Sequence, residues 1–214
     1  MALFAFIPHF SHAVEWQPVD NTADGIQIFR KEVKDSGLVA FRGIGIVDAP
    51  LPLVATAIFD TDRRRKWVAG LVDSRIIRWG AKDSFIEYDH IRMPLFLKDR
   101  DFVSIGKMSF DLSKKEMVFR YQPSDDPSAP RTKHIRGELI DTIFILSSID
   151  NDKKTRVDAE FLCDPKGWIP KWVVNFYLKV WPKTTFRNLR KEVQRDVSVD
   201  TRFSNLIEKG SIGQ

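Results

Sequence analysis

Side chains that could do chemistry are few and scattered in this chain of 214 residues. The four histidines are far apart in the sequence: His9, His12, His90 and His134. No Gly-x-Ser-x-Gly elbow, His-Glu-x-x-His motif or glycine-rich phosphate loop occurs, so the common signatures of hydrolases and nucleotide enzymes are missing. Acid–base chemistry would have to come from isolated groups that the fold encloses. The candidates are Glu87, Tyr88, His90 and Asp141.

Polar residues of this kind can also fix the polar end of an apolar ligand inside a cavity. Arg64 lies three residues before Trp67, and Tyr88 and Arg92 share one parity of a strand-like run in which Glu87 has the other. The sequence leaves open which parity faces inward. We expect Arg64, Trp67, Tyr88 and Arg92 to contribute to a ligand site, with no metal and no cofactor.

Arg100 and Asp101 form a charged pair just before an apolar strand-like run. Neighbouring strand residues point to opposite faces, so Asp101 and Phe102 cannot both face one cavity. We assign Arg100, Phe102 and Met108 to the ligand side. Asp101 we assign to structural hydrogen bonds.

These residues need a scaffold, and the periodicity predicts a hairpin, two short helices and an antiparallel meander. The hairpin comprises 26–33 and 38–47, joined by the turn 34–37, and the helices cover 53–59 and 63–68, with Thr61 and Asp62 able to cap the second. The meander strands are expected at 74–79, 84–93, 102–112, 116–122, 136–149 and 155–163. Alternation places Phe119 and Phe161 on the apolar faces of their strands, so both join the expected ligand side.

The last predicted element is an amphipathic helix from about Pro170 to Val197, with a kink at Pro182. Apolar residues recur at helical spacing on its first half, and basic residues follow Pro182. We expect the following helix residues to face the ligand: Trp172, Val173, Phe176 and Val180. Other apolar residues widen this stripe: Val174, Leu178 and Trp181.

Two runs carry a family resemblance. One is Arg-Met-Pro-Leu-Phe-Leu-Lys-Asp-Arg-Asp-Phe-Val at 92–103, and the other is Gly-Trp-Ile-Pro-Lys-Trp at 167–172. Together with Arg65-Lys66-Trp67 they make the chain, from Trp16 to about Val197, resemble the START (StAR-related lipid-transfer) domain. The resemblance implies an α+β helix-grip fold, in which a curved antiparallel sheet wraps around a long C-terminal helix and encloses a cavity. The family pattern commonly has Asp after the short-helix Trp, whereas this chain has Val68, which argues against a phosphate site there.

The resemblance also implies a function. We expect the protein to bind one hydrophobic lipid without catalysis and to transfer or present it, with a transient membrane contact. Leu95, Phe96 and Leu97 would form a gate loop beside the final helix. The alternative is a helix-grip enzyme of the aromatase/cyclase kind that uses an inward acid or base. A partner-binding module using the basic helix would instead have a filled interior.

The ends and the composition give the remaining expectations. Residues 1–13 resemble the end of a signal peptide, followed by a START-like domain at 14–214. A cleaved signal would make the protein periplasmic or secreted, and otherwise it would be cytoplasmic. The net charge of +5 comes without any nucleic-acid-binding motif. One cysteine, Cys163, excludes an intramolecular disulfide. We expect a monomer that does not bind nucleic acid.

Overall fold

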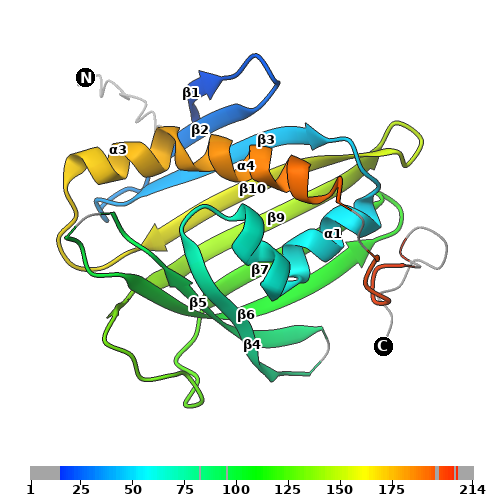
Figure 1. The fold of residues 1–214 in the computed structure, drawn as a ribbon. Helices are drawn as coiled ribbons and strands as arrows, with labels where there is room; N and C mark the ends of the chain where they lie inside the picture. Colours follow the sequence, from blue (N-terminus) through cyan, green and yellow to red (C-terminus); the bar gives the residue numbers. More distant parts are fainter. Residues whose placement is uncertain (1–14, 82, 95, 196–197, 205, 207–214) are drawn as a thin grey trace, which may run out of the picture.

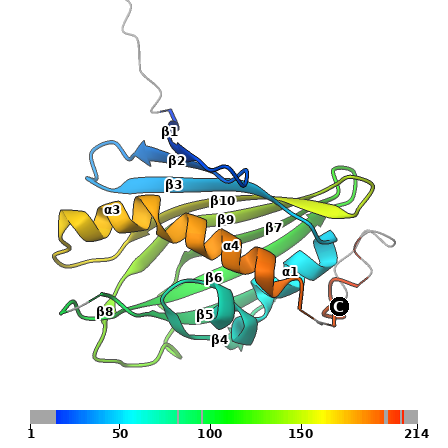
Figure 2. The same cartoon turned by 45° about the horizontal axis from the view of Figure 1, so that its top comes forward.

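The structure is a computed structural model that describes residues 15–81, 83–94, 96–195, 198–204 and 206. The expected signal segment 1–13 and the gate residue Leu95 lie outside the described residues. A strongly curved sheet carries the helices on its concave face, as Figure 1 and Figure 2 show from two directions. The expected α+β helix-grip fold is confirmed.

Ten strands of the described residues form one sheet in the order β1-β2-β3-β10-β9-β7-β6-β5-β4, with antiparallel neighbours, and β8 pairs parallel with β6. The strands are β1 (Gln17–Asn21), β2 (Gln27–Glu32), β3 (Val39–Val47), β4 (Leu71–Trp79), β5 (Ser84–Ile91), β6 (Arg100–Asp111), β7 (Glu116–Pro123), β8 (Ile135–Arg136), β9 (Glu138–Ile149) and β10 (Lys154–Asp164). The hairpin turn between β2 and β3 uses Gly37, whose φ of 68° suits glycine.

Two short helices follow the hairpin, α1 (Leu51–Phe59) and α2 (Thr61–Trp67). The expected cap at Thr61 and Asp62 is wrong by one residue. Asp60 is the N-cap, and its Oδ1 accepts from the backbone N–H groups of Asp62 at 3.0 Å and Arg63 at 3.2 Å. This cap starts the helix that carries Arg64 and Trp67.

The final helix is split into α3 (Lys171–Lys179) and α4 (Trp181–Glu192), with Val180 between them. Pro182 lies in the first turn of α4, where a residue without an N–H is tolerated. The expected single kinked helix is therefore two helices, and the break lies at the predicted proline. No helix of the described residues is both long and apolar enough to cross a bilayer.

The main core fills only one end of the concave face. Side chains from β6, β7 and β9 pack there against α1, α4 and the C-terminal residues Phe203 and Leu206, which are both fully buried. The other end of the concave face lies under α3, and this is where the interior is hollow.

Candidate functional site

A cavity of about 430 Å³ lies between the concave face of the sheet and α3 with the start of α4. This volume falls within the roughly 300–1,000 Å³ typical of small-molecule sites. Most of the lining is apolar: Leu38, Val39, Phe41, Trp67, Val68, Leu71, Ile91, Met93, Phe102, Leu139, Phe144, Phe161, Cys163, Ile169, Val174, Tyr177 and Trp181. The arrangement can remove an apolar body from water while a few polar groups orient it.

Four of the residues expected in the ligand site line this cavity: Arg64, Trp67, Phe102 and Phe161. Arg100, which we also assigned to this side, is among the lining residues. Trp67 is held in place by its indole N–H, which donates to the Ala57 carbonyl at 3.0 Å and so ties α2 to α1. The alternation along the strands and the position on the helix were sufficient to predict that these five residues face the cavity.

Met108 and Phe119 lie outside the cavity lining, although the face predicted for them is correct. Met108 shares the parity of Phe102 on β6 and pairs with Phe119 on β7. Both belong to the main core, and Met108 lies six residues beyond Phe102 along β6. Parity gives the face of a strand but not how far along it the hollow extends.

Tyr88 and Arg92 also lie outside the lining. Tyr88 points to the convex face, where it packs with Ile86 and Val103, and the Arg75 guanidinium lies 4.7 Å from the centre of its ring. Arg92 follows the end of β5 and is exposed. On β5, the residues that face the cavity are therefore Glu87 and those that alternate with it. The sequence left this alternative open.

The expected stripe on the final helix is also displaced. Trp172, Phe176 and Val180 are 47%, 41% and 41% exposed, and Val173 is buried without lining the cavity. The residues of α3 and α4 that line the cavity are Val174, Tyr177, Trp181 and Thr185. This helix has apolar residues around most of its surface, so its periodicity alone does not single out the inner stripe.

The inner end of the cavity is polar. Arg64 donates from Nη1 to Glu87 Oε1 at 2.7 Å and from Nη2 to Oε2, and Asp89, Tyr121 and Thr142 lie on the same lining. Burial raises the pKa of the Glu87 carboxyl to about 8, against the lowering effect of Arg64 and with a further rise from Asp89. Asp89 and Thr142 were missed, although Asp89 shares the parity of Glu87.

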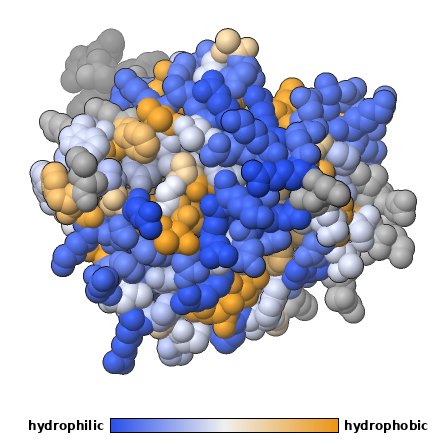
Figure 3. All heavy atoms as spheres, viewed as in Figure 1, coloured by the Kyte–Doolittle hydropathy of each residue, from blue (hydrophilic) through white to orange (hydrophobic). Residues whose placement is uncertain are grey.

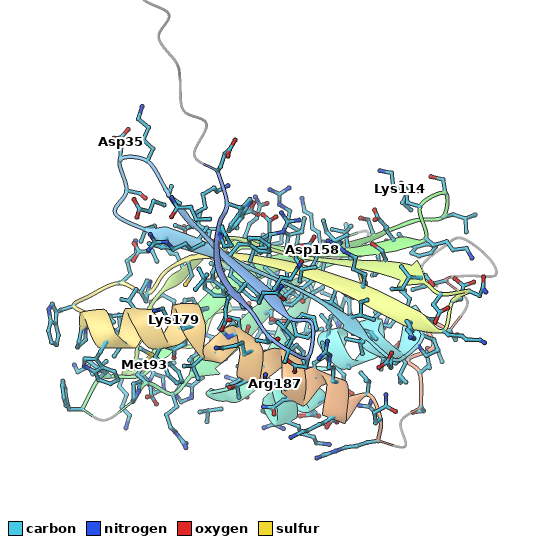
Figure 4. All side chains as sticks on the ribbon, turned by 90° about the horizontal axis from the view of Figure 1, so that it is seen from above. Asp35, Met93, Lys114, Asp158, Lys179 and Arg187 are labelled. Carbon is cyan, nitrogen blue, oxygen red and sulfur yellow. The ribbon has the colours of Figure 1, made fainter. Side chains whose placement is uncertain are left out.

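The segment before β6 is fixed at its base. The Asp99 carboxylate accepts the Met93 N–H at 2.9 Å and contacts His90 Nε2 at 2.8 Å. Tyr177 of α3 donates its hydroxyl hydrogen to Met93 Sδ at 3.4 Å, and Figure 4 shows Met93 beside α3. The loop expected to form a gate therefore begins directly next to the helix over the cavity. Phe96 in this loop is 74% exposed, and Leu97 is half-buried.

Arg100 joins this loop to the segment that precedes α3. Its guanidinium donates to the carbonyl oxygens of Lys98 at 2.6 Å, Pro165 at 3.2 Å and Lys166 at 3.1 Å. Asp101 points the other way and accepts from Thr132 Oγ1 at 2.5 Å and Arg136 Nε at 2.8 Å. The structural hydrogen bonds expected of Asp101 are present.

The other acid–base candidates lie elsewhere. His90 is outside the cavity lining, and its ring stacks on that of His134 with the ring centres 4.0 Å apart. Asp141 accepts the Arg120 guanidinium at 2.8 Å on the exposed side of the sheet. Burial raises the pKa of the Cys163 thiol to about 11, which keeps it unreactive at neutral pH. Glu87 is thus the enclosed member of the predicted set.

The chain is also similar to known proteins, both in sequence and in fold. The START domain profile matches residues 11–197. A phosphatidylcholine transfer protein of Mus musculus is 26% identical over 172 residues, which is 77% of each chain. Human StAR-related lipid transfer protein 5 superposes with a TM-score of 0.76 at 18% identity, covering 86% of this chain and 88% of that one.

A more distant likeness is to the Zhui aromatase/cyclase from Streptomyces sp. R1128, with a TM-score of 0.50 and 11% identity over 75% of this chain and 96% of that one. At these identities the solved structures show a shared fold alone. The profile match spans the sheet, the cavity and both halves of the final helix. The chain therefore belongs to the START domain family.

Proposed function

We propose that this protein binds one hydrophobic lipid in the cavity under α3 and transfers it to, or presents it at, a membrane. The observation that carries the proposal is the cavity itself, about 430 Å³ in volume and lined mainly by apolar side chains with polar groups at one end. The similarity to phosphatidylcholine transfer proteins supports it.

The energetics suit a carrier. Burying apolar surface is favourable by ~25 cal/mol per Å², or ~0.8 kcal/mol for each buried CH₂ group. A chain of ten carbons would thus gain roughly 8 kcal/mol before the cost of ordering ligand and protein is subtracted. No covalent step is needed to hold such a ligand.

Release requires an opening, and we assign it to α3 and the loop at 94–98. The hairpin β1–β2 holds α4 through ion pairs, Lys183 with Asp20 at 2.7 Å and Arg187 with Asp24 at 2.8 Å. Arg187 is labelled on α4 in Figure 4. Trp181 donates its indole N–H to the Ala69 carbonyl at 2.7 Å. The break after Lys179 then allows α3 to move while α4 stays in place.

The moving parts and the segment just before α3 carry exposed aromatic side chains, which we call the apolar rim: Phe96, Trp168, Trp172 and Phe176. Figure 3 shows apolar surface beside α3 on a largely hydrophilic face. Large exposed apolar side chains of this kind are typical of surfaces that contact a partner or a membrane. We propose that the apolar rim makes a transient contact with the lipid bilayer.

The test is transfer of a fluorescent lipid from donor to acceptor vesicles, together with native mass spectrometry of the purified protein. We expect saturable transfer and one bound lipid per chain. A protein that neither accelerates transfer nor retains a lipid would refute the proposal.

Glu87 favours a second candidate, an enzyme of the aromatase/cyclase kind, because its carboxyl is enclosed and has a pKa raised to about 8. A carrier returns its ligand unchanged, whereas an enzyme changes it. Masses of ligands recovered after prolonged incubation therefore separate the two. An altered mass that Glu87→Gln abolishes would favour the enzyme.

A further inference from the structure

Two histidines that are far apart in the sequence meet a carboxylate outside the cavity. One nitrogen of His90, one nitrogen of His134 and one oxygen of Asp99 all lie within 4.8 Å of one another. The two imidazole rings stack with their centres 4.0 Å apart, and Asp99 Oδ2 lies 2.8 Å from His90 Nε2. Two imidazoles and one carboxylate are a set of donors that binds divalent transition metals. We call these three residues the His–Asp cluster.

The fold brings the His–Asp cluster together from three segments. His90 lies near the end of β5, and Asp99 directly precedes β6, the antiparallel neighbour of β5. His134 directly precedes β8, whose Ile135 N–H donates to the Asp99 carbonyl at 3.0 Å. The parallel register that pairs Arg100 with Ile135 therefore sets Asp99 beside His134. Sequence spacing could not predict this arrangement, because it depends on the pairing of three strands.

The carboxylate of the cluster is oriented by its second oxygen. Asp99 Oδ1 accepts the Met93 N–H at 2.9 Å, which leaves Oδ2 directed toward His90. Carboxylates that bind metals are commonly held by such an outer hydrogen bond. The side chains of His90 and Asp99 are 15% and 26% exposed, so an ion can reach them from solvent and water can complete its coordination.

The kind of ion follows from the donors. Magnesium and calcium prefer oxygen ligands, whereas imidazole nitrogen suits zinc and its neighbours among the transition metals. On β5, His90 shares the parity of Tyr88, which faces away from the cavity, and none of the three cluster residues lines the cavity. An ion bound here would not occupy the space of a lipid.

We propose that the His–Asp cluster binds one Zn²⁺ ion per chain through one nitrogen of each imidazole and the Asp99 carboxylate. Ligand atoms around tetrahedral zinc lie about 3.3 Å apart, so the His134 ring must turn partly out of the stack to reach the ion. The bound ion then ties the end of β5 to the starts of β6 and β8, at the base of the loop at 94–98. This site goes beyond the proposed function and does not depend on lipid binding.

The test is competition between the intact protein and a chromogenic zinc chelator at neutral pH. We expect one Zn²⁺ per chain, with Mg²⁺ and Ca²⁺ bound at least about a hundredfold more weakly. His134→Asn and Asp99→Asn should each weaken Zn²⁺ binding at least about tenfold, since losing even an outer hydrogen bond to a ligand costs about 10–100-fold. A His9→Asn and His12→Asn double variant, which removes the other two histidines of the chain, is the matched control and should bind as before.

X-ray absorption spectroscopy of the unaltered protein with one equivalent of Zn²⁺ needs no variant. It should show nitrogen and oxygen ligands with two imidazole rings and no sulfur, which distinguishes the cluster from Cys163. Circular dichroism checks that the variants fold. Failure to bind Zn²⁺ stoichiometrically, a sulfur ligand, or equal binding by folded His134→Asn and Asp99→Asn would each overturn the inference. Lipid transfer is measured separately, so a failure of the proposed function would leave this site unaffected.

Discussion

At the residue scale, the buried Arg64–Glu87 pair links the stability of the fold to pH. The pair is buried, with Glu87 only 1% exposed, and it lies against the second carboxyl of Asp89. Removing a carboxylate from water disfavours its charged form, and Arg64 offsets this only in part. Protonation of Glu87 is therefore coupled to folding.

Glu87 should make the protein less stable as the pH rises. Its folded-state pKa of about 8 lies above the unfolded value of 4.5, so the folded state binds more protons between these limits. The contribution to the free energy of unfolding is present below pH 4.5 and is lost as the pH rises toward 8. Urea unfolding across this range should show that loss in the unaltered protein relative to Glu87→Gln. Parallel curves for the two proteins would contradict the assignment.

At the element scale, the last helix is divided into α4, which ion pairs hold to the β1–β2 hairpin, and α3, which we propose moves when the ligand is released. The ion pairs connect α4 to the β1–β2 hairpin, whereas α3 lies over the cavity and its Tyr177 contacts Met93, the residue before the loop at 94–98. Pro182 prevents the backbone hydrogen bond that would continue α3 into α4.

Replacing Pro182 should therefore stiffen the junction. In Pro182→Ala the restored N–H favours one continuous helix, so we expect lipid transfer to slow several-fold with unchanged equilibrium binding. Thr184→Ala, an exposed change two residues farther along α4, is the matched control. Vesicle transfer kinetics and equilibrium titration give the two readouts, and equal transfer rates for both variants would count against a hinge.

The apolar rim gives a second prediction at this scale. A Phe96→Ser, Trp172→Ser and Phe176→Ser variant should transfer lipid to vesicles at least tenfold more slowly but hold it as well in solution, because each buried aromatic ring contributes roughly 1.5–3 kcal/mol at a membrane. Leu112→Ser is the control, since Leu112 is also exposed but lies near Lys114, which Figure 4 shows far from α3. If the triple variant transfers lipid as fast as the control, the apolar rim is not the membrane contact.

The same elements show how far the sequence carries the prediction. Alternation placed Phe102 and Phe161 on the inner face, because strand parity is a local property. It could not exclude Met108 and Phe119, since the boundary between filled core and hollow depends on α1, α4 and the C-terminal residues. The stripe on α3 was misplaced because apolar residues cover most of the surface of this helix, so its periodicity does not single out the inner stripe. The inward orientation of Glu87 could be determined only from the register of β5 with its neighbouring strands.

At the scale of the whole molecule, the interior is filled at one end and hollow at the other. Phe203 and Leu206 close the filled end, and they follow the region that the START profile matches. Phe203 contacts the rings of Phe59 and Phe119, with ring centres 5.6 Å and 6.0 Å away. Phe203 and Leu206 are therefore part of the core.

Phe203→Ala should lower the free energy of unfolding by about 3–5 kcal/mol, the usual effect of removing a buried Phe ring. Val199→Ala, at an exposed position of the same segment, should change it by less than about 0.5 kcal/mol. Urea denaturation measures both. A small effect at Phe203 would mean that the segment does not pack as described.

The hydrogen bonds of Arg100 have a consequence for the kinetics of ligand release. One guanidinium holds carbonyl oxygens from both segments that border the cavity, Lys98 on one side and Pro165 and Lys166 on the other. If either segment moves away, some N–H groups of the Arg100 guanidinium lose their carbonyl partners. Arg100 is only 1% exposed, and buried donors without partners are costly. The two segments should therefore separate in a single concerted event. Ligand release would then follow one exponential, and Arg100→Lys, which cannot span all three carbonyls, should split it into two phases.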